Sequence, residues 1–264
     1  MRVVVVGCTG RMGYALLEGI FADENLTLHA ALDRVDSPSI GRDAGEQFGK
    51  ITGVKVTSDV QAIRGADVLI DFTRPEASLQ YLSICQAEKV SMVIGTTGFT
   101  AEQKSLIQQA SQEIGIVFAP NMSVGVTLLT NLVEAAARVL NQGYDIEVIE
   151  AHHRHKVDAP SGTALRLGEA AAAGAGRDFD KVALYAREGI TGERAPESIG
   201  FATVRGGDVV GDHTVLFAGI GERIELTHKA SSRATFALGA LRAAKYLKDK
   251  PPGLFDMRDV LELR

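Results

Sequence analysis

The chain has 264 residues, of which 28 are basic and 33 are acidic, and its formal net charge at pH 7 is −5. This length suits one large domain or two small ones, and the hydrophobic share of 45% is ordinary for a globular protein. The acidic balance argues against a general nucleic-acid or anionic-membrane binder, the apolar runs are too short to span a bilayer, and the two distant cysteines exclude a disulfide framework. Because no signal segment follows Met1, we expect a soluble, cytoplasmic protein.

Residues 1–120 alternate between apolar, strand-like runs and helical patterns. We expect strands at Arg2–Val6, Leu26–Leu32, Val68–Phe72, Val90–Ile94 and Ile116–Phe118, and helices at Met12–Ala22, Pro75–Glu88 and Ala101–Glu113. Strands that are apolar throughout and alternate with helices are typical of a parallel sheet covered on both faces. The pattern therefore predicts a doubly wound α/β domain.

The pattern changes after Pro120. We expect helices at Gly125–Asn141 and Thr163–Ala173, and strands at Ile146–Glu150, Gly200–Val204, His213–Phe217 and Arg223–His228. The last three strands are joined by Gly206-Gly207 and by Gly219-Ile220-Gly221, and such turns favour antiparallel hairpins. This predicts a C-terminal α+β domain with a mixed or antiparallel sheet. We expect the last helix, Ala234–Asp249, to pack back on the first domain, so that residues 1–123 and 233–264 form one domain and residues 124–232 the other.

A glycine-rich loop follows the first predicted strand and opens the first predicted helix. Its candidate cofactor-binding residues are Gly7, Cys8, Thr9, Gly10, Arg11 and Met12. Glycines at such a turn let the backbone approach a pyrophosphate, and the helix N-terminus supplies N–H groups and partial positive charge. Asp33 lies 20 residues beyond Gly13, where a carboxylate meets the ribose hydroxyls of a dinucleotide. The sequence thus predicts a Rossmann-type dinucleotide-binding domain, and a tight turn without a ligand is the alternative.

The residues after the second predicted strand leave the choice of nicotinamide cofactor open. Asp33 favours the ribose diol of NAD, whereas the neighbouring Arg34 can pair with the extra phosphate of NADP. The pair indicates that the protein uses NADH, NADPH or both, although Arg34 also fits a solvated surface charge.

Three further loops leave the carboxyl ends of predicted strands, where ligands bind in sheets of this kind. Their small and hydroxyl side chains suit a nicotinamide ribose and amide, although each loop taken singly also fits ordinary turn chemistry. The cofactor-binding candidates in them are Phe72 and Arg74, then Gly95, Thr96 and Thr97, and finally Ala119, Pro120, Asn121 and Met122.

The most informative segment is rich in cations. Three of the six histidines lie within four positions, and they alternate with basic residues in His152, His153, Arg154, His155 and Lys156. Cations and titratable groups at this density would bind a small anionic substrate and donate protons near neutral pH. A metal site and a solvated loop are the alternatives. The first lacks carboxylate or cysteine partners at a supporting spacing, so we expect no metal.

The same segment continues into the start of a helix. Ser161, Gly162 and Thr163 occupy that start, and their N–H groups and hydroxyls can take a carboxylate. Neither cysteine has the surroundings of an acylating thiol, and both are expected to pack in the interior.

Together these motifs resemble those of the dihydrodipicolinate reductase family of the bacterial lysine and diaminopimelate pathway. The resemblance runs over the whole chain, and its most specific part is Glu150–Ala164, where His-His-x-x-Lys precedes Asp-Ala-Pro-Ser-Gly-Thr-Ala. The loops Gly7–Gly13, Asp71–Thr73 and Gly95–Gly98 also match. Asp33 stands where the family often has Glu, which keeps the carboxylate but shortens its side chain.

The resemblance implies an NAD(P)H-dependent reduction of 4-hydroxy-tetrahydrodipicolinate, a cyclic dicarboxylated hydroxy-imine, to tetrahydrodipicolinate with loss of water. It implies that His152 donates and accepts protons and that Lys156 is a second proton donor. The substrate carboxylates would bind to His153, Ser161, Gly162 and Thr163.

The resemblance further implies a second domain that binds the substrate, a homotetramer built through the sheets of that domain, and closure of both domains over the ligands. The residues alone leave open another two-domain dehydrogenase and a non-catalytic sensor of the NADH/NAD ratio.

Overall fold

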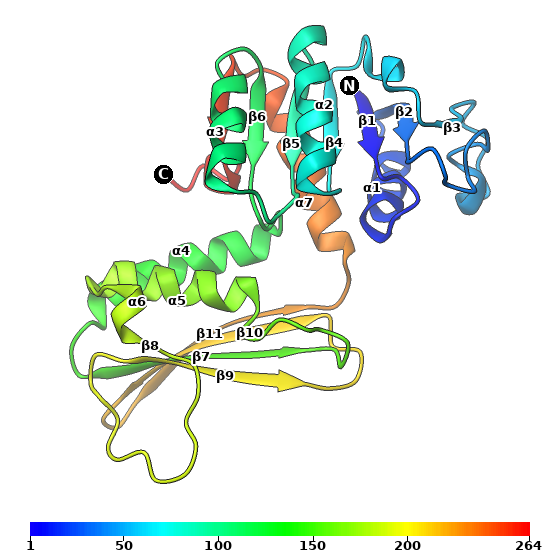
Figure 1. Cartoon of the computed structure of the whole chain (residues 1–264). Coiled ribbons are helices and arrows are strands. Elements are labelled where there is room, and N and C mark those ends of the chain that lie inside the picture. Colours follow the sequence, from blue (N-terminus) through cyan, green and yellow to red (C-terminus); the bar gives the residue numbers. More distant parts are fainter. The chain divides into compact units, whose positions relative to one another are not determined.

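Two units make up the fold, and the chain passes from the first to the second and back again. The computed structural model describes all 264 residues. One unit comprises Met1–Val124 and Arg233–Arg264, and the other comprises Gly125–Ser232. The return of the chain is visible in Figure 1, where helix α7 (Ala234–Leu247) lies beside strands from the N-terminal part of the sequence.

A seven-stranded parallel sheet forms the centre of the first unit. The strand order is β12-β6-β5-β4-β1-β2-β3. The strands are β1 (Arg2–Val6), β2 (Thr27–Leu32), β3 (Val56–Thr57), β4 (Val68–Asp71), β5 (Ser91–Ile94), β6 (Gly115–Phe118) and β12 (Gly253–Phe255). Because β1 pairs with both β2 and β4, the strand order reverses at β1, and this is where ligands bind in such sheets.

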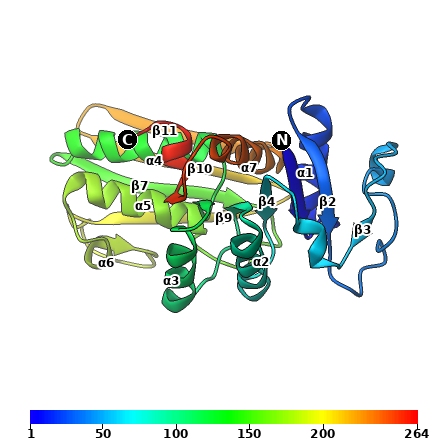
Figure 2. The same cartoon turned by 90° about the horizontal axis from the view of Figure 1, so that it is seen from above.

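Helices cover both faces of this sheet. Figure 2 shows α1 and α7 on one side and α2 and α3 on the other. Pro75 occupies the first turn of α2, and Thr100 begins α3 with a capping box completed by Gln103. None of the helices is both long and apolar enough to cross a membrane. The helices of this unit are α1 (Arg11–Ala22), α2 (Pro75–Glu88), α3 (Ala101–Ala110), α7 and α8 (Met257–Val260), with the 3-10 turns η1 (Glu46–Phe48) and η2 (Val60–Ile63).

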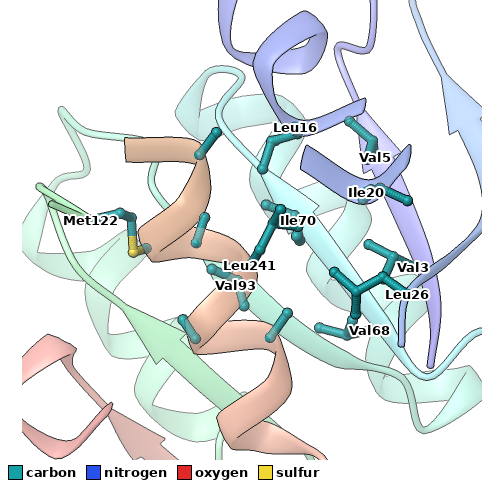
Figure 3. Packing of buried hydrophobic residues seen from close by; sticks show 14 of the residues in the cluster. Val3, Val5, Leu16, Ile20, Leu26, Val68, Ile70, Val93, Met122 and Leu241 are labelled. Atoms are coloured by element: carbon teal, nitrogen blue, oxygen red, sulfur yellow. The ribbon is translucent and has the colours of Figure 1, made fainter. Parts of the chain in front are cut away.

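The core of the first unit has two layers because β1 is apolar on both faces. Val3 and Val5 pack toward α1 and α7, while Val4 and Val6 pack into the opposite layer. Figure 3 shows the first layer, in which Leu241 of α7 lies among these strand residues. Helix α7 also approaches the backbone closely, since a Cβ on Gly239 would lie 1.7 Å from the carbonyl oxygen of Met122.

The second unit is a five-stranded sheet with its helices on one face. The strand order is β11-β10-β7-β9-β8. Strand β7 alternates, so that Ile146, Val148, Glu150 and His152 are buried on the side that also carries the core residues of α4 and α5. The elements are α4 (Val124–Val139), β7 (Tyr144–His152), α5 (Gly162–Ala175), α6 (Phe179–Val182), β8 (Ala183–Leu184), β9 (Ile199–Arg205), β10 (Gly211–Gly219) and β11 (Arg223–Ala230).

One of the two predicted hairpins forms and the other does not. Strands β10 and β11 are antiparallel neighbours around Gly219-Ile220-Gly221, as predicted. The prediction of a hairpin at Gly206-Gly207 was wrong, because β7 lies between β9 and β10, parallel to the former and antiparallel to the latter. The predicted fold class, a doubly wound α/β domain followed by an α+β domain with a mixed sheet, is confirmed.

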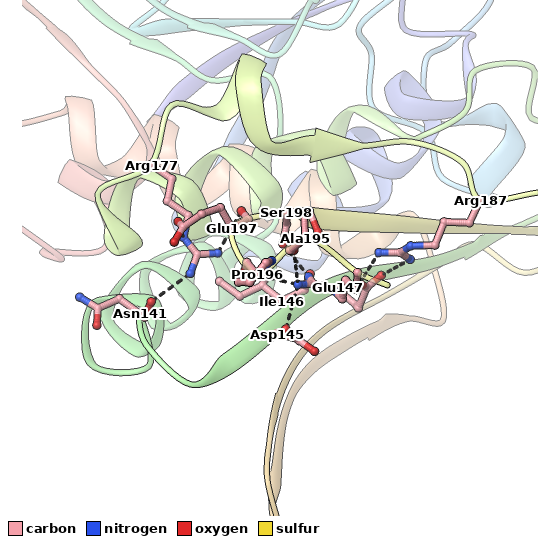
Figure 4. Close-up of polar contacts among 11 residues, drawn as sticks. Asn141, Asp145, Ile146, Glu147, Arg177, Arg187, Ala195, Pro196, Glu197 and Ser198 are labelled. Carbon is pink, nitrogen blue, oxygen red and sulfur yellow. Dashed lines mark hydrogen bonds and ion pairs between the residues drawn. The ribbon is translucent and has the colours of Figure 1, made fainter. Parts of the chain in front are cut away.

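An arginine-rich segment is tied to the other face of β7. Glu147 accepts hydrogen bonds from both ends of the Arg187 guanidinium, at 3.0 and 2.7 Å, and from Arg194 Nε at 3.1 Å (Figure 4). Arg194 also donates to the carbonyl oxygen of Ile146 at 2.9 Å. Burial opposes ionisation of Glu147, but these two arginines hold its pKa below the ordinary value.

Candidate active site

In the first unit, the glycine-rich loop turns tightly between β1 and α1. Gly7 has a φ of +65°, in the left-handed region that favours glycine. A Cβ on Gly13 would lie 2.3 Å from the Gly7 carbonyl oxygen, so α1 can approach the loop only without a side chain there. Gly10 is the N-cap of α1 and has no capping side chain. The first N–H groups of α1 are therefore available to an anion such as a pyrophosphate.

Asp33 follows β2 and lies against this loop. Its Oδ2 accepts hydrogen bonds from the Thr9 amide at 3.1 Å and from the Thr9 hydroxyl, and its Oδ1 accepts one from the Arg34 amide at 2.8 Å. Arg34 Nε pairs with Asp36 Oδ1 at 3.1 Å, and both of these side chains are largely exposed. The structure thus joins the predicted ribose carboxylate to the predicted phosphate loop.

Buried polar groups gather at the carboxyl ends of β4 and β5. Asp71 Oδ1 accepts hydrogen bonds from the Thr73 amide at 2.8 Å and the Thr73 hydroxyl at 2.6 Å. The side chains of Asp71, Ser78 and Thr96 are buried together at this edge. Burial raises the pKa of Asp71, against the hydrogen bonds from Ser78, Thr73 and Thr96. A buried polar cluster at this edge fits the polar end of a ligand such as a nicotinamide ribose or amide.

The sheet topology brings the predicted cofactor residues to one edge of the first unit. β2, β1, β4, β5 and β6 are consecutive neighbours, so the loops that follow them are adjacent. Phe72 packs against Gly95, where a Cβ would lie 2.1 Å from its ring. The side chains of Cys8, Ala119 and Met122 are buried in the core. The other candidates in or beside these loops are Arg11, Met12, Arg74, Thr97, Pro120 and Asn121.

In the second unit, a carboxylate holds the predicted catalytic histidine. His152 Nδ1 lies 2.6 Å from Glu150 Oε2, and both side chains are buried on β7. Arg205, at the end of β9, donates to both oxygens of Glu150 at 2.7 and 2.9 Å. Burial alone would raise the pKa of Glu150, but the hydrogen bonds from Arg205, His152 and the Ser161 amide hold it below the ordinary value. Because an ionised carboxylate only accepts hydrogen bonds, His152 Nδ1 donates to Glu150.

Ser161 joins the start of α5 to the same cluster. Its Oγ accepts from the Ala164 amide at 3.1 Å as the N-cap, and it lies 3.0 Å from His213 Nε2. Its amide donates to Glu150 Oε1 at 3.0 Å. Burial, with the nearby His152 as the next cause, lowers the pKa of His213 to about 4. His213 is therefore neutral near pH 7, and a hydrogen bond joins its Nε2 to the Ser161 hydroxyl.

Lys156 belongs to a turn that begins at His153. Its amide donates to the His153 carbonyl at 3.1 Å, and its Nζ lies 2.8 Å from Asp158 Oδ2. The side chain of Lys156 is only 21% exposed, so its ammonium is held in place rather than freely solvated. The hydrogen bond from Lys156 lowers the pKa of Asp158. Gly162 and Thr163 follow as the first residues of α5.

Three residues of this cluster were not predicted as site residues. Glu150 lies within the quoted motif but carried no assigned role, and Arg205 and His213 lie far along the chain on β9 and β10. The strand register places these residues together. His213 on β10 and Thr203 on β9 are the register partners of Glu150, and Arg205 on β9 is the register partner of His152. No group of three or more His, Cys, Asp or Glu side chains is placed to hold a metal ion.

A glycine-rich loop of the dinucleotide-binding type in one unit and a buried, carboxylate-bound histidine in the other are typical of an oxidoreductase. Comparison with known proteins gives the family. The N-terminal model of dihydrodipicolinate reductase matches residues 1–122, and the C-terminal model of the same enzyme matches residues 125–261. The chain belongs to the dihydrodipicolinate reductase family, which confirms the predicted family, fold class and oxidoreductase class.

Curated relatives extend the match to full length. The chain is 62% identical to the 4-hydroxy-tetrahydrodipicolinate reductase of Thiobacillus denitrificans, over 100% of this chain and 99% of that protein. It is 63% identical to the enzyme of the same name from Laribacter hongkongensis, with the same coverage. Among solved structures, it is similar to the dipicolinate-bound dihydrodipicolinate reductase from Paenisporosarcina sp. TG-14, with a TM-score of 0.78, 26% identity and 97% of each chain covered.

Proposed function

We propose that the protein reduces 4-hydroxy-tetrahydrodipicolinate to tetrahydrodipicolinate in lysine and diaminopimelate biosynthesis, in the cytoplasm. One hydride from NADH or NADPH and one proton enter, and water leaves together with the oxidised cofactor. The observation that carries this proposal is the pairing of His152 with Glu150, whose carboxylate also binds the Ser161 amide at the start of α5. This arrangement combines a proton donor with a binding place for carboxylates, which a reduction of a dicarboxylated imine requires.

The first unit would hold the nicotinamide cofactor. The backbone of Gly7–Met12 and the N-terminus of α1 would bind the pyrophosphate, and Asp33 would accept hydrogen bonds from the adenosine ribose. Arg34 would meet the extra phosphate of NADPH, at the cost of its pairing with Asp36. The loops after β4, β5 and β6 would surround the nicotinamide end, which supplies the hydride when bound.

The second unit would bind the substrate and supply the proton donors. His153, Ser161, Gly162 and Thr163 would bind the substrate carboxylates, using the N–H groups at the start of α5. Hydride arriving at an electrophilic carbon leaves negative charge on the adjacent atom. His152, through Nε2, would protonate that atom, and Lys156 would be a second proton donor.

Domain closure and oligomerisation would also depend on this division of the chain into a cofactor-binding unit and a substrate-binding unit. Hydride transfer requires contact between the nicotinamide and the substrate, so the two units would close over their ligands. The sheet of the second unit would build a homotetramer. Ile149 and Val204, which lie on the sheet face opposite the buried residues of β7, are 38% and 53% exposed, and a second copy of the chain would cover them.

The test is oxidation of NADH and NADPH by the purified protein, with the labile substrate made in place from pyruvate and aspartate semialdehyde by the preceding synthase. We expect rapid oxidation that depends on the synthase. Lys156→Ala should lower turnover by about 100-fold or more while the NADH dissociation constant stays near wild type. Lys181→Ala, which removes an exposed lysine of the same unit, is the matched control and should keep full activity.

Two outcomes would overturn the proposal. Absence of oxidation with intact NADH binding would favour a sensor or another substrate. Equal loss of NADH binding and turnover in Lys156→Ala would place Lys156 in the cofactor site.

A further inference from the structure

Glu150 is an anion on a strand face that otherwise packs into the core. It lies on the same face of β7 as Ile146 and Val148, and its side chain is 1% exposed. A carboxylate at such a place is costly unless every oxygen is paired. Both oxygens of Glu150 are paired, which indicates a role that an apolar residue could not fill.

The two oxygens of Glu150 have different partners. Oε2 receives His152 Nδ1 at 2.6 Å, and Oε1 receives the Ser161 amide at 3.0 Å. Arg205 bridges both oxygens, and Thr203 Oγ1 lies 3.4 Å from Oε1. One face of the carboxylate therefore meets the proton donor, and the other meets the residue that begins the carboxylate-binding helix.

Every element packed around His152 contributes a charged or titratable group. Glu150 lies on its own strand, Arg205 on β9, and His213 on β10 with its ring centroid 5.0 Å from that of His152. The loop after β7 adds the ion pair of Lys156 and Asp158. Glu150 is the one anion that is hydrogen-bonded to the His152 ring, so the orientation of that ring depends on it.

We propose that Glu150 is the positioning residue of the active site: it fixes His152 as the Nδ1–H tautomer with Nε2 directed to the substrate, and it holds the Ser161 end of α5 in register with that histidine. Arg205 keeps the carboxylate in place with its two-pronged hydrogen bond. This inference rests on the proposed proton transfer by His152. It adds that the proton donor and the carboxylate cradle are set by one side chain.

A purely structural role is the competing explanation. In that case Glu150 would only neutralise the buried end of Arg205, and its loss would weaken the fold without changing the tautomer of His152. The two explanations predict different activities, and different His152 tautomers, for a Glu150 variant that still folds. Glu150→Gln is informative because its amide has one acceptor oxygen: either orientation loses one hydrogen bond from Arg205 and turns NH₂ toward the His152 Nδ1–H or toward the Ser161 amide.

The kinetic experiment compares Glu150→Gln with Glu147→Gln. Glu147 is three positions earlier on β7 and is also paired with two arginines, but it faces the opposite side of the sheet. For Glu150→Gln we expect kcat to fall by about 100-fold or more and the substrate KM to rise, because both the His152 ring and the Ser161 end of α5 lose their anchor, while NADH binding stays unchanged. Glu147→Gln should keep kcat within about twofold of wild type. Glu150→Asp, which retracts the carboxylate, should recover only part of the loss.

The second measurement does not depend on activity. ¹⁵N NMR of histidine-labelled wild-type protein, with His152 assigned through His152→Gln, reports which ring nitrogen carries the proton. We expect protonated Nδ1 in the wild type and a changed pattern in Glu150→Gln. An Nε2–H tautomer in the wild type would overturn the proposal even if Glu150→Gln failed to fold.

The outcomes separate this proposal from the proposed function. Full activity in His152→Gln would remove His152 from proton transfer while leaving the tautomer result standing. Equal kinetic losses in Glu150→Gln and Glu147→Gln, or a fall in stability with unchanged kcat, would reduce Glu150 to a structural residue.

Discussion

The buried histidine on β10 makes the stability of the protein depend on pH in a defined window. His213 is 4% exposed, and its pKa is lowered from 6.5 to about 4, first by burial and next by the nearby His152. Its folded pKa lies below its unfolded pKa, so its contribution to stability is fully present above pH 6.5. That contribution is lost as the pH falls toward 4, because the unfolded chain takes up the proton first.

The size of this effect follows from the shift. One pKa unit corresponds to 1.36 kcal/mol, so the lowering of the pKa to about 4 amounts to about 3 kcal/mol, of which about 2.5 kcal/mol is lost by pH 4.5. Carboxylates whose pKa is lowered, such as Asp43 at about 2, contribute at more acidic pH. Glutamates whose pKa is lowered from 4.5, such as Glu147 and Glu150, begin to contribute near the acidic end of the window, so the effect of His213 is isolated by comparing the wild type with a His213 variant.

The assay is urea unfolding at pH 7.5 and pH 4.5 for the wild type and for His213→Gln. Glutamine keeps a hydrogen-bonding group near the Ser161 hydroxyl but does not titrate. We expect the wild type to lose about 2.5 kcal/mol more than the variant between the two pH values. An NMR titration of the His213 ring gives its pKa directly. Equal losses in both proteins, or a His213 ring that titrates near pH 6.5, would refute the reasoning.

Two further predictions concern the first unit. Asp33→Ala should weaken NADH binding more than NADPH binding, because the ribose diol loses its acceptor while Arg34 remains; titration of both cofactors checks this, and equal weakening would contradict it. Gly239→Ala should lower the free energy of unfolding by about 2 kcal/mol or more, because its Cβ would overlap the Met122 carbonyl oxygen. Gly206→Ala, where a Cβ meets nothing within 4 Å, is the control, and similar urea midpoints for both variants would speak against this packing argument.

Periodicity predicted the long elements well because each carries its own signal. The strand Arg2–Val6 and the helix Pro75–Glu88 have the predicted bounds. The start of the helix was predictable because a proline marks its first turn. The two-residue strand β3 and the short β12 were not predicted, since segments of this length have no period to detect. Their pairing with β2 and β6 is decided by tertiary contacts.

The pairing of strands was predictable only where a turn dictates it. Gly219-Ile220-Gly221 forces β10 and β11 together, whereas the connection at Gly206-Gly207 lets β7 lie between its flanking strands. The same limit applies to the site. His152, Lys156 and Ser161 are close in sequence and were predicted together. Arg205 reaches Glu150 only through a parallel pairing of strands 55 residues apart, which no local pattern encodes.

The return of the chain to its first unit has a consequence for how the protein is made. Strand β1 and helix α1 expose the apolar face that α7 covers, and Leu241 reaches that face only after all of Gly125–Ser232 has been synthesised. During translation the cofactor-binding unit therefore stays incomplete while the inserted unit is synthesised, and the apolar face of β1 and α1 stays exposed to solvent. This interval is when the nascent chain is most prone to aggregate, and loss of the last two helices would make that exposure permanent.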